Sequence, residues 1–168
     1  MKTKLVNNIL PVEINKQIIN DLVNHHWYIA WDINMNRVEK IFSNKNNGFS
    51  VTTYDFGKAI GNSPLNKYGK MVFDIVIKKT KLKAELERIF WNMYFKNSES
   101  ELHKDRFDNN FISVVYNLHT TDGGTEIDGK FYKDMEGQAK IFNSNILHKG
   151  VGAKNSNVRF NLNLILKI

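Results

Sequence analysis

The most regular alternation of apolar and polar residues lies near the end of the sequence, over residues 158–168. Its apolar positions are Phe160, Leu162, Leu164 and Leu166. Its polar positions are Arg159, Asn161 and Asn163. Successive side chains of a β-strand point to opposite faces, so this segment predicts a strand with one face in a core. The polar face either meets solvent or lines a wet cavity. Solvent is the simpler expectation, because antiparallel sheets often have one wet face.

Short segments of similar character, separated by turn residues, fill the chain from about residue 88. We expect strands at 88–96, 101–105, 111–119, 125–127, 139–142, 146–151 and 158–168. Many short strands at close spacing are typical of a sandwich or barrel of the jelly-roll kind.

The first half of the chain has a different pattern. Pro11 suits the first turn of a helix, and Ile14, Ile18 and Leu22 follow at four-residue spacing. The other expected elements are a strand at 27–33, a polar loop at 34–48, a strand at 49–54 and a helix at about 65–79. The loop is either a segment that covers a substrate or a simple surface loop. We therefore expect one domain, 1–168, in which 1–87 form a buttress of helices and strands and 88–168 form the jelly-roll core.

The composition narrows the function classes. The 168 residues include no cysteine, which excludes disulfides, thiolate metal sites and cysteine nucleophiles. An apolar leader and a transmembrane stretch are also missing, so we expect a cytoplasmic protein that does not enter membranes. The net charge of +7 would suit an acidic partner such as nucleic acid. The lysines are scattered, however, and a dispersed excess of charge does not favour that interpretation.

Two histidines and one aspartate form the most informative set of polar residues. His103 and Asp105 are two positions apart on a predicted strand, so their side chains leave the same face. His148 follows in a later predicted strand. Two imidazoles and one carboxylate can occupy one face of an octahedral iron(II) ion and leave the other positions open. An isolated H-x-D is a weak signal, but here the order, the spacing and the strand context agree.

Arg159 follows His148 by eleven residues. An arginine at this place can hold a dicarboxylate by a two-pronged ion pair. The other histidines and the tryptophans have simpler explanations, as surface, helix-end or core residues.

From Arg88 to the C-terminus the chain resembles the iron(II)- and 2-oxoglutarate-dependent dioxygenases, on their prolyl-4-hydroxylase-like branch. The similar stretches are H-K-D, V-V-Y-N-L-H, D-G-G-T-E-I and G-Q-A-K-I-F-N-S-N-I-L-H-K-G, followed by the arginine strand. The resemblance implies a mainly β fold with supporting helices, a double-stranded β-helix of the cupin-like jelly-roll type. It implies Fe(II) bound by His103, Asp105 and His148, with 2-oxoglutarate and O2 as co-substrates and ascorbate as an optional reductant.

The resemblance also implies a co-substrate pocket. Arg159 would pair with the distal carboxylate of 2-oxoglutarate, and Tyr94 would contact the same molecule. Asn163 corresponds to a position that commonly lines the pocket. Asn117 stands where relatives often have a second contacting tyrosine, so this sequence departs from the family pattern there.

The implied activity is hydroxylation of an aliphatic carbon, with release of succinate and CO2. The expected substrate is a prolyl or other residue of a peptide, or an amino acid. Two alternatives stay open: the same chemistry on a nucleobase or small anionic metabolite, and a jelly-roll binding module without catalysis.

Overall fold

The computed structural model describes residues 2–26, 28–29 and 48–168. Its two described helices are α1 (Val12–Val23) and α3 (Pro64–Thr80). Pro11, with φ fixed at −60°, directly precedes α1. The hydroxyl of Ser63 accepts a hydrogen bond from the Leu65 amide and so caps α3, which ends where Lys81 takes a left-handed conformation. Both predicted helices are confirmed.

The strands form two antiparallel sheets. Their bounds are β1 (Lys4–Val6), β2 (Tyr28–Ile29), β3 (Gly48–Asp55), β4 (Lys58–Ala59), β5 (Glu85–Phe95), β6 (Phe111–Asn117), β7 (Gly124–Ile127), β8 (Lys130–Lys133), β9 (Ala139–Asn143), β10 (His148–Val151) and β11 (Val158–Lys167). Within the described residues, the major sheet has the order β1-β9-β6-β11-β5-β3-β2, with β4 beside β3, and the minor sheet has the order β10-β7-β8.

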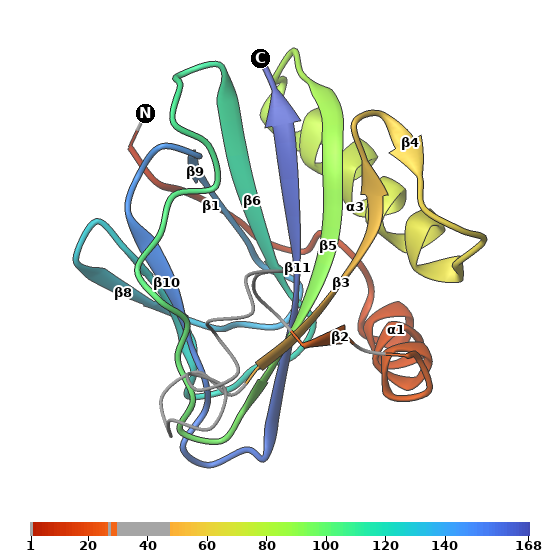
Figure 1. Cartoon of the computed structure of the whole chain (residues 1–168), viewed down its shortest axis with the longest axis vertical. Coiled ribbons are helices and arrows are strands. Elements are labelled where there is room, and N and C mark those ends of the chain that lie inside the picture. The colour runs from red at the N-terminus through yellow and green to blue at the C-terminus, as the bar shows by residue number, and fades with distance from the viewer. Residues whose placement is uncertain (1, 27, 30–47) are drawn as a thin grey trace.

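Figure 1 shows three layers: the helices, the major sheet, and the minor sheet on the opposite side. The main apolar core fills the space between the helices and the major sheet. It includes Leu22, Val72, Trp91, Leu162 and Leu164, each with no exposed surface. A smaller cluster of Val115, Ile127 and Phe142 lies on the other side of the major sheet, toward the minor sheet. The expected architecture, mainly β with supporting helices, is confirmed.

The polar face of β11 is not exposed to solvent. Arg159, Asn161 and Asn163 are 0%, 3% and 4% exposed. They lie on the face of the major sheet that the minor sheet covers, so the expectation of a solvated face is wrong and the cavity alternative holds.

The predicted strand at 101–105 is also wrong. In that segment only His103 pairs, through an isolated bridge to His148. Strands β1, β4 and β8 were not predicted. Of the strand expected at 27–33, residues 28–29 are extended, while 27, 30–33 and most of the loop at 34–48 lie outside the described residues.

The expected boundary after residue 87 falls inside β5, which pairs with β3 on one side and β11 on the other. Both parts of the chain thus contribute to one sheet. Neither described helix is long and apolar enough to cross a bilayer.

Candidate metal centre

His103 and His148 are brought together by the bridge between their backbones. The His103 amide donates to the His148 carbonyl at 2.9 Å, and the His148 amide donates to the His103 carbonyl at 2.9 Å. The two rings lie 4.4 Å apart, centroid to centroid. This pairing fixes both imidazoles on the inner side of the minor sheet, opposite the polar face of β11.

Both imidazoles are held in the same way. Nδ1 of His103 lies 2.8 Å from the Glu101 carbonyl, and Nδ1 of His148 lies 2.9 Å from the Ile146 carbonyl. A carbonyl only accepts, so each ring carries a proton at Nδ1, and in the neutral form of the ring the lone pair is at Nε2. This arrangement is common for metal-binding histidines, whose second nitrogen donates to a carbonyl or carboxylate.

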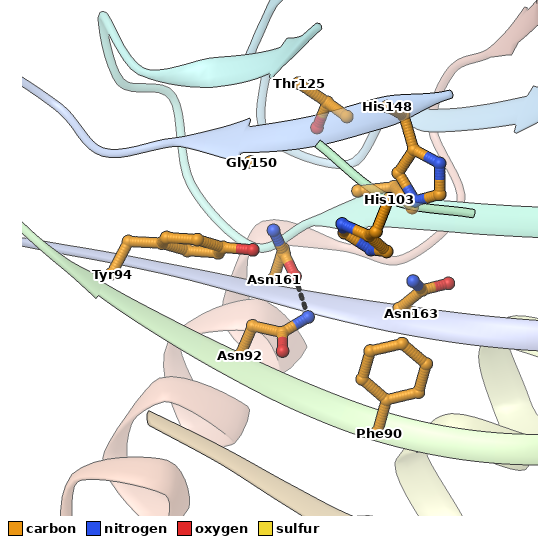
Figure 2. A pocket seen from close by; sticks show the side chains of 10 residues that line it. Phe90, Asn92, Tyr94, His103, Thr125, His148, Gly150, Asn161 and Asn163 are labelled. Atoms are coloured by element: carbon orange, nitrogen blue, oxygen red, sulfur yellow. Dashed lines mark hydrogen bonds between the residues drawn. The ribbon is translucent and has the colours of Figure 1, made fainter. Parts of the chain in front are cut away.

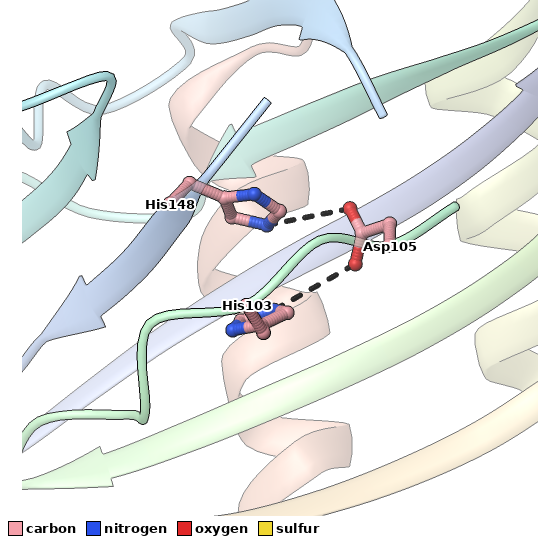
Figure 3. Close-up of side chains that lie close together, drawn as sticks. All are labelled: His103, Asp105 and His148. Atoms are coloured by element: carbon pink, nitrogen blue, oxygen red, sulfur yellow. Dashed lines mark ion pairs between the residues drawn. The ribbon is translucent and has the colours of Figure 1, made fainter. Parts of the chain in front are cut away.

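Both Nε2 atoms are close to Asp105 (Figure 3). Nε2 of His148 lies 3.4 Å from Oδ2 of Asp105, and Nε2 of His103 lies 3.7 Å from Oδ1. All three ligand atoms lie within 4.8 Å of one another. Ligands at right angles around an ion, each about 2.1 Å from it, are about 3 Å apart. Small side-chain rotations would therefore complete a three-ligand site.

The Asp105 carboxylate is fixed from behind. Oγ of Ser113 donates to Oδ2 of Asp105 at 2.5 Å, and Ser113 itself is hydrogen bonded to Ser144 at 2.8 Å. Burial by itself would raise the pKa of Asp105, but the hydrogen bond and charge of His148 and the hydrogen bond of Ser113 lower it overall. The carboxylate is therefore ionised near neutral pH, which is the form that binds a cation.

A small cavity of about 40 Å³ opens beside the imidazoles. Figure 2 shows its lining side chains. They are Phe90, Asn92, Tyr94, His103, Val115, Thr125, His148, Gly150, Asn161 and Asn163. The side chain of His103 is 41% exposed, whereas that of His148 is 3% exposed, so the approach from solvent is on the His103 side. The cavity could hold about three water molecules.

The register of the major sheet explains how its polar residues meet at the cavity. Asn161 of β11 pairs with Asn92 of β5 and with Asn117 of β6. Nδ2 of Asn92 donates to Oδ1 of Asn161 at 3.0 Å. Asn163 lies one pleat further along, where Nδ2 is 3.5 Å from Oδ2 of Asp105. Its buried Oδ1 has no hydrogen-bond partner among the described residues, and the side chain lines the cavity, so it can accept from a bound ligand.

The predicted co-substrate residues fall into two groups. Tyr94 and Asn163 line the cavity. Asn117 does not: its Oδ1 accepts from Nζ of Lys140 at 3.1 Å. Arg159 is fully buried beside the cavity, and its Nη2 donates to Oγ1 of Thr125 at 3.2 Å.

The guanidinium of Arg159 has a carboxylate partner within the chain. Its Nε donates to Oδ2 of Asp134, and its Nη2 donates to Oδ1 of the same residue at 3.2 Å. The guanidinium also lies over the Tyr94 ring, 4.8 Å from its centroid. Arg159 is therefore held beside the cavity by Asp134, Thr125 and Tyr94.

Sequence reasoning missed Ser113, Thr125, Asp134 and Lys140. Thr125 lies directly after Gly123-Gly124, in a stretch whose resemblance was noted, so that signal was available. Ser113 and Lys140 are polar residues in predicted strands whose neighbours are mostly apolar, which is a weaker signal. Asp134 lies directly after β8, in the connection to β9, and its sequence context gives no indication of burial.

Comparisons of the sequence find no matching family model and no matching curated protein. Comparisons of the structure find clear matches. The viral collagen prolyl hydroxylase of Paramecium Bursaria Chlorella virus-1, solved with 2-oxoglutarate, is 15% identical, with a TM-score of 0.63 over 100% of this chain and 97% of that chain. A prolyl hydroxylase of Trichoplax adhaerens, solved with a peptide fragment of hypoxia inducible factor, is 13% identical, with a TM-score of 0.68 over 98% and 83% of the two chains.

A third match has another activity. The α-ketoglutarate-dependent epimerase SnoN of nogalamycin biosynthesis is 8% identical, with a TM-score of 0.70 over 98% of this chain and 76% of that chain. At such identities the matches establish the fold. The predicted jelly-roll fold, shared with prolyl hydroxylases and other 2-oxoglutarate- and iron(II)-dependent oxygenases, is confirmed.

Proposed function

We propose that this protein is an Fe(II)- and 2-oxoglutarate-dependent dioxygenase that hydroxylates an aliphatic carbon. The observation that supports this most strongly is the preformed set of His103, Asp105 and His148, with both Nε2 atoms directed at one ionised carboxylate. A binding module without catalysis would not need two imidazoles held in the metal-binding tautomer beside a buried carboxylate.

The donor set fits iron(II). Two neutral imidazoles and a carboxylate are the ligands of the facial triad, and three protein ligands leave up to three positions for other molecules. When bound, iron(II) supplies the O2 chemistry that couples decarboxylation of 2-oxoglutarate to oxidation of the substrate. Ser113 keeps Asp105 oriented toward the imidazoles. The carbonyls of Glu101 and Ile146 keep the protons of the imidazoles on Nδ1.

Several residues could receive 2-oxoglutarate. The hydroxyl-bearing side chains of Tyr94 and Thr125 line the cavity, and the positive charge of Arg159 lies directly behind them. Asn163 lies between the cavity and Asp105. Of the predicted co-substrate residues, Tyr94 and Asn163 have positions from which they could touch the molecule, and Arg159 could attract its distal carboxylate. Asn117 does not line the cavity but accepts a hydrogen bond from Lys140, so its effect on co-substrate binding would be indirect.

A peptide or amino-acid substrate, prolyl in the first instance, is the most consistent choice. Among the described residues that line the cavity none is lysine or arginine, and Lys149, next to His148, is paired with Glu99 at 3.0 Å. Arg159, behind the cavity, would serve the co-substrate, so this lining gives no preference for a nucleotide phosphate or another anionic metabolite as the oxidised molecule. One structural neighbour is a prolyl hydroxylase solved with a peptide. Another neighbour is an epimerase, so the turnover experiment below screens several classes of substrate.

The first experiment measures metal binding. Isothermal titration calorimetry with Mn2+, which replaces Fe(II) without oxidation, is expected to show one site in the native protein. His148→Ala should abolish that site, whereas the matched control His26→Ala, at an exposed histidine outside the site, should retain it. Equal Mn2+ binding by native protein and His148→Ala would refute the metal centre.

The second experiment measures turnover. Protein with Fe(II), 2-oxoglutarate, O2 and ascorbate is incubated with pools of prolyl peptides, free amino acids or oligonucleotides, and succinate is quantified. Succinate should form above the no-substrate level with a peptide or amino-acid pool and not with the Asp105→Ala variant. Release with oligonucleotides alone would favour the nucleobase alternative.

A further inference from the structure

A cluster of three charged side chains lies fully buried behind the cavity: Asp134, Lys140 and Arg159. Asp134 follows β8, Lys140 is in β9 and Arg159 is in β11. Oδ1 of Asp134 accepts from Nζ of Lys140 at 2.6 Å and from Nη2 of Arg159 at 3.2 Å. One carboxylate is thus shared by two cations, and the three groups together have a charge of +1.

The sharing limits how far Asp134 neutralises Arg159. A guanidinium can make a two-pronged ion pair through either of two edges, and the edge of Arg159 formed by Nε and Nη2 is bound to Asp134. If Asp134 had no other partner, the pair would be neutral and would offer little to a second carboxylate. Lys140 draws the same carboxylate oxygen toward itself, so part of the charge of Arg159 stays uncompensated.

All three groups are charged near neutral pH. Burial would raise the pKa of Asp134, but Arg159 and Lys140 lower it overall. Burial lowers the pKa of Lys140 to about 8, and the charge of Asp134 opposes the fall. A buried excess of positive charge raises the electrostatic free energy of the folded protein, and a second anion bound nearby lowers it.

The cluster is one side-chain layer away from the cavity. Thr125 accepts from Nη2 of Arg159, and the ring of Tyr94 lies against the guanidinium. Both residues line the cavity. An anionic group that entered between Tyr94 and Thr125 would therefore meet the excess charge of the cluster.

We propose that Lys140 is a specificity-determining residue: by sharing Asp134 with Arg159, it gives the cavity a preference for dicarboxylic over monocarboxylic 2-oxo acids. This inference rests on the proposed function, because it assumes that the cavity receives a 2-oxo acid. Lys140 acts through Asp134 and Arg159 and does not itself touch the ligand.

The test compares 2-oxoglutarate with 2-oxopentanoate, which has the same carbon chain but lacks the distal carboxylate. Affinities for both are measured by isothermal titration calorimetry on Mn2+-loaded protein, and their ratio is the preference for the diacid. Lys140→Met removes the charge and retains most of the side-chain volume. It is expected to reduce the preference roughly fifteen- to fiftyfold, as for one charge acting over about 7–10 Å at an effective dielectric constant of about 20.

Two further variants separate charge from structure. Lys130→Met removes a lysine from the exposed hairpin strand β8 and should leave the preference unchanged. The double variant Asp134→Asn, Lys140→Met restores the cluster charge to +1 and should recover most of the preference that Lys140→Met loses. The double variant is used in place of Asp134→Asn alone, which would leave two buried cations without their shared carboxylate. Circular dichroism confirms that each variant is folded.

The outcomes discriminate between the two proposals. If native protein binds Mn2+ but neither 2-oxo acid, the proposed function and this inference both fail. If native protein prefers 2-oxoglutarate and Lys140→Met keeps that preference within twofold, only the role of Lys140 is refuted. A loss in Lys130→Met equal to that in Lys140→Met would likewise refute it, because the effect would then follow total charge.

Discussion

Replacement of Gly150 by alanine tests whether Tyr94 is fixed at the cavity. Gly150 lies in β10 two residues after His148, on the same face. A Cβ at this position would lie 2.3 Å from Oη of Tyr94 and 2.4 Å from its Cζ, whereas ordinary contact begins at 3.4 Å. The tyrosine ring would have to move by about 1.1 Å, the difference between 3.4 and 2.3 Å.

The ring has little freedom to make that movement. Tyr94 is 6% exposed, its backbone pairs with Arg159 in the neighbouring strand, and its ring lies 4.8 Å from the guanidinium. Overpacking of this kind costs about 1–3 kcal/mol, and the reduced entropy of the unfolded chain offsets about 0.4–1 kcal/mol of it. We expect a net loss of roughly 1–2 kcal/mol in the free energy of unfolding.

Two measurements check this expectation. Urea denaturation gives the loss of stability, and calorimetry on Mn2+-loaded protein gives the affinity for 2-oxoglutarate, which should fall about tenfold or more because a displacement near 1 Å disrupts a fitted contact. The control is Gly129→Ala, where nothing lies within 4 Å but φ is +72°. It should lose about 1 kcal/mol through backbone strain and keep its affinity for 2-oxoglutarate. Native-like stability and affinity in Gly150→Ala would show that Tyr94 is not held against β10.

Three further predictions concern the site and the core. Ser113→Ala removes the hydrogen bond to Asp105 and should lower Mn2+ affinity roughly ten- to a hundredfold with the fold intact, as measured by calorimetry and circular dichroism. Leu164→Ala, at a core position with no exposed surface, should lower the free energy of unfolding by about 2–5 kcal/mol, while Mn2+ affinity of the folded protein stays unchanged. The preference for 2-oxoglutarate over 2-oxopentanoate should fall as pH rises through about 8, where Lys140 loses its proton, and should show no such step in Lys140→Met. The charged groups that face Lys140 among the described residues are Asp134 and Arg159.

The titration of Lys140 also affects stability. Its pKa is lowered in the folded protein from the ordinary 10.5 to about 8, so the unfolded chain binds more protons between those values. Stability therefore rises with pH across that window as far as this group is concerned. The titration of Lys140 therefore has opposite effects on binding and on stability. The charged lysine increases the preference for the diacid, whereas the neutral lysine increases the free energy of unfolding.

Local patterns were sufficient to predict most strands, and they indicated that two of the three candidate metal ligands lie close together. In β11 the alternation is regular and each side chain has one clear environment, so the strand and its core face were predicted correctly. His103 and Asp105 are close in sequence, and their spacing alone places them together. The segment around them was expected to be a strand, but it pairs only at His103, because the chain turns away toward Ser144, whose carbonyl accepts from the Asp105 amide at 3.0 Å.

Other features depend on contacts between distant parts of the chain. The hairpin of β7 and β8 turns at Asp128-Gly129, a recognised signal for a tight turn, and the strand after it was missed because its residues are mostly exposed. The minor sheet that contains this hairpin covers the polar face of β11. The pattern of β11 does not reveal that a second sheet packs over it. The sequence alone therefore could not show whether Asn161 and Asn163 face solvent or line a cavity.

The two faces of the major sheet have different roles, and the alternation within single strands separates them. Leu162 and Leu164 pack toward α1 and α3, in the larger apolar cluster, whereas Asn161 and Asn163 face the minor sheet, where the apolar cluster is small. Buried amides and charges cost free energy unless they are paired, and the large core on the helix side can compensate for that cost. The helices, although far from the imidazoles, therefore matter for the site: they stabilise a sheet whose other face can remain polar. A shift of β11 by one residue would exchange these faces and place Leu162 and Leu164 at the cavity, so the register of this strand determines both the core and the site.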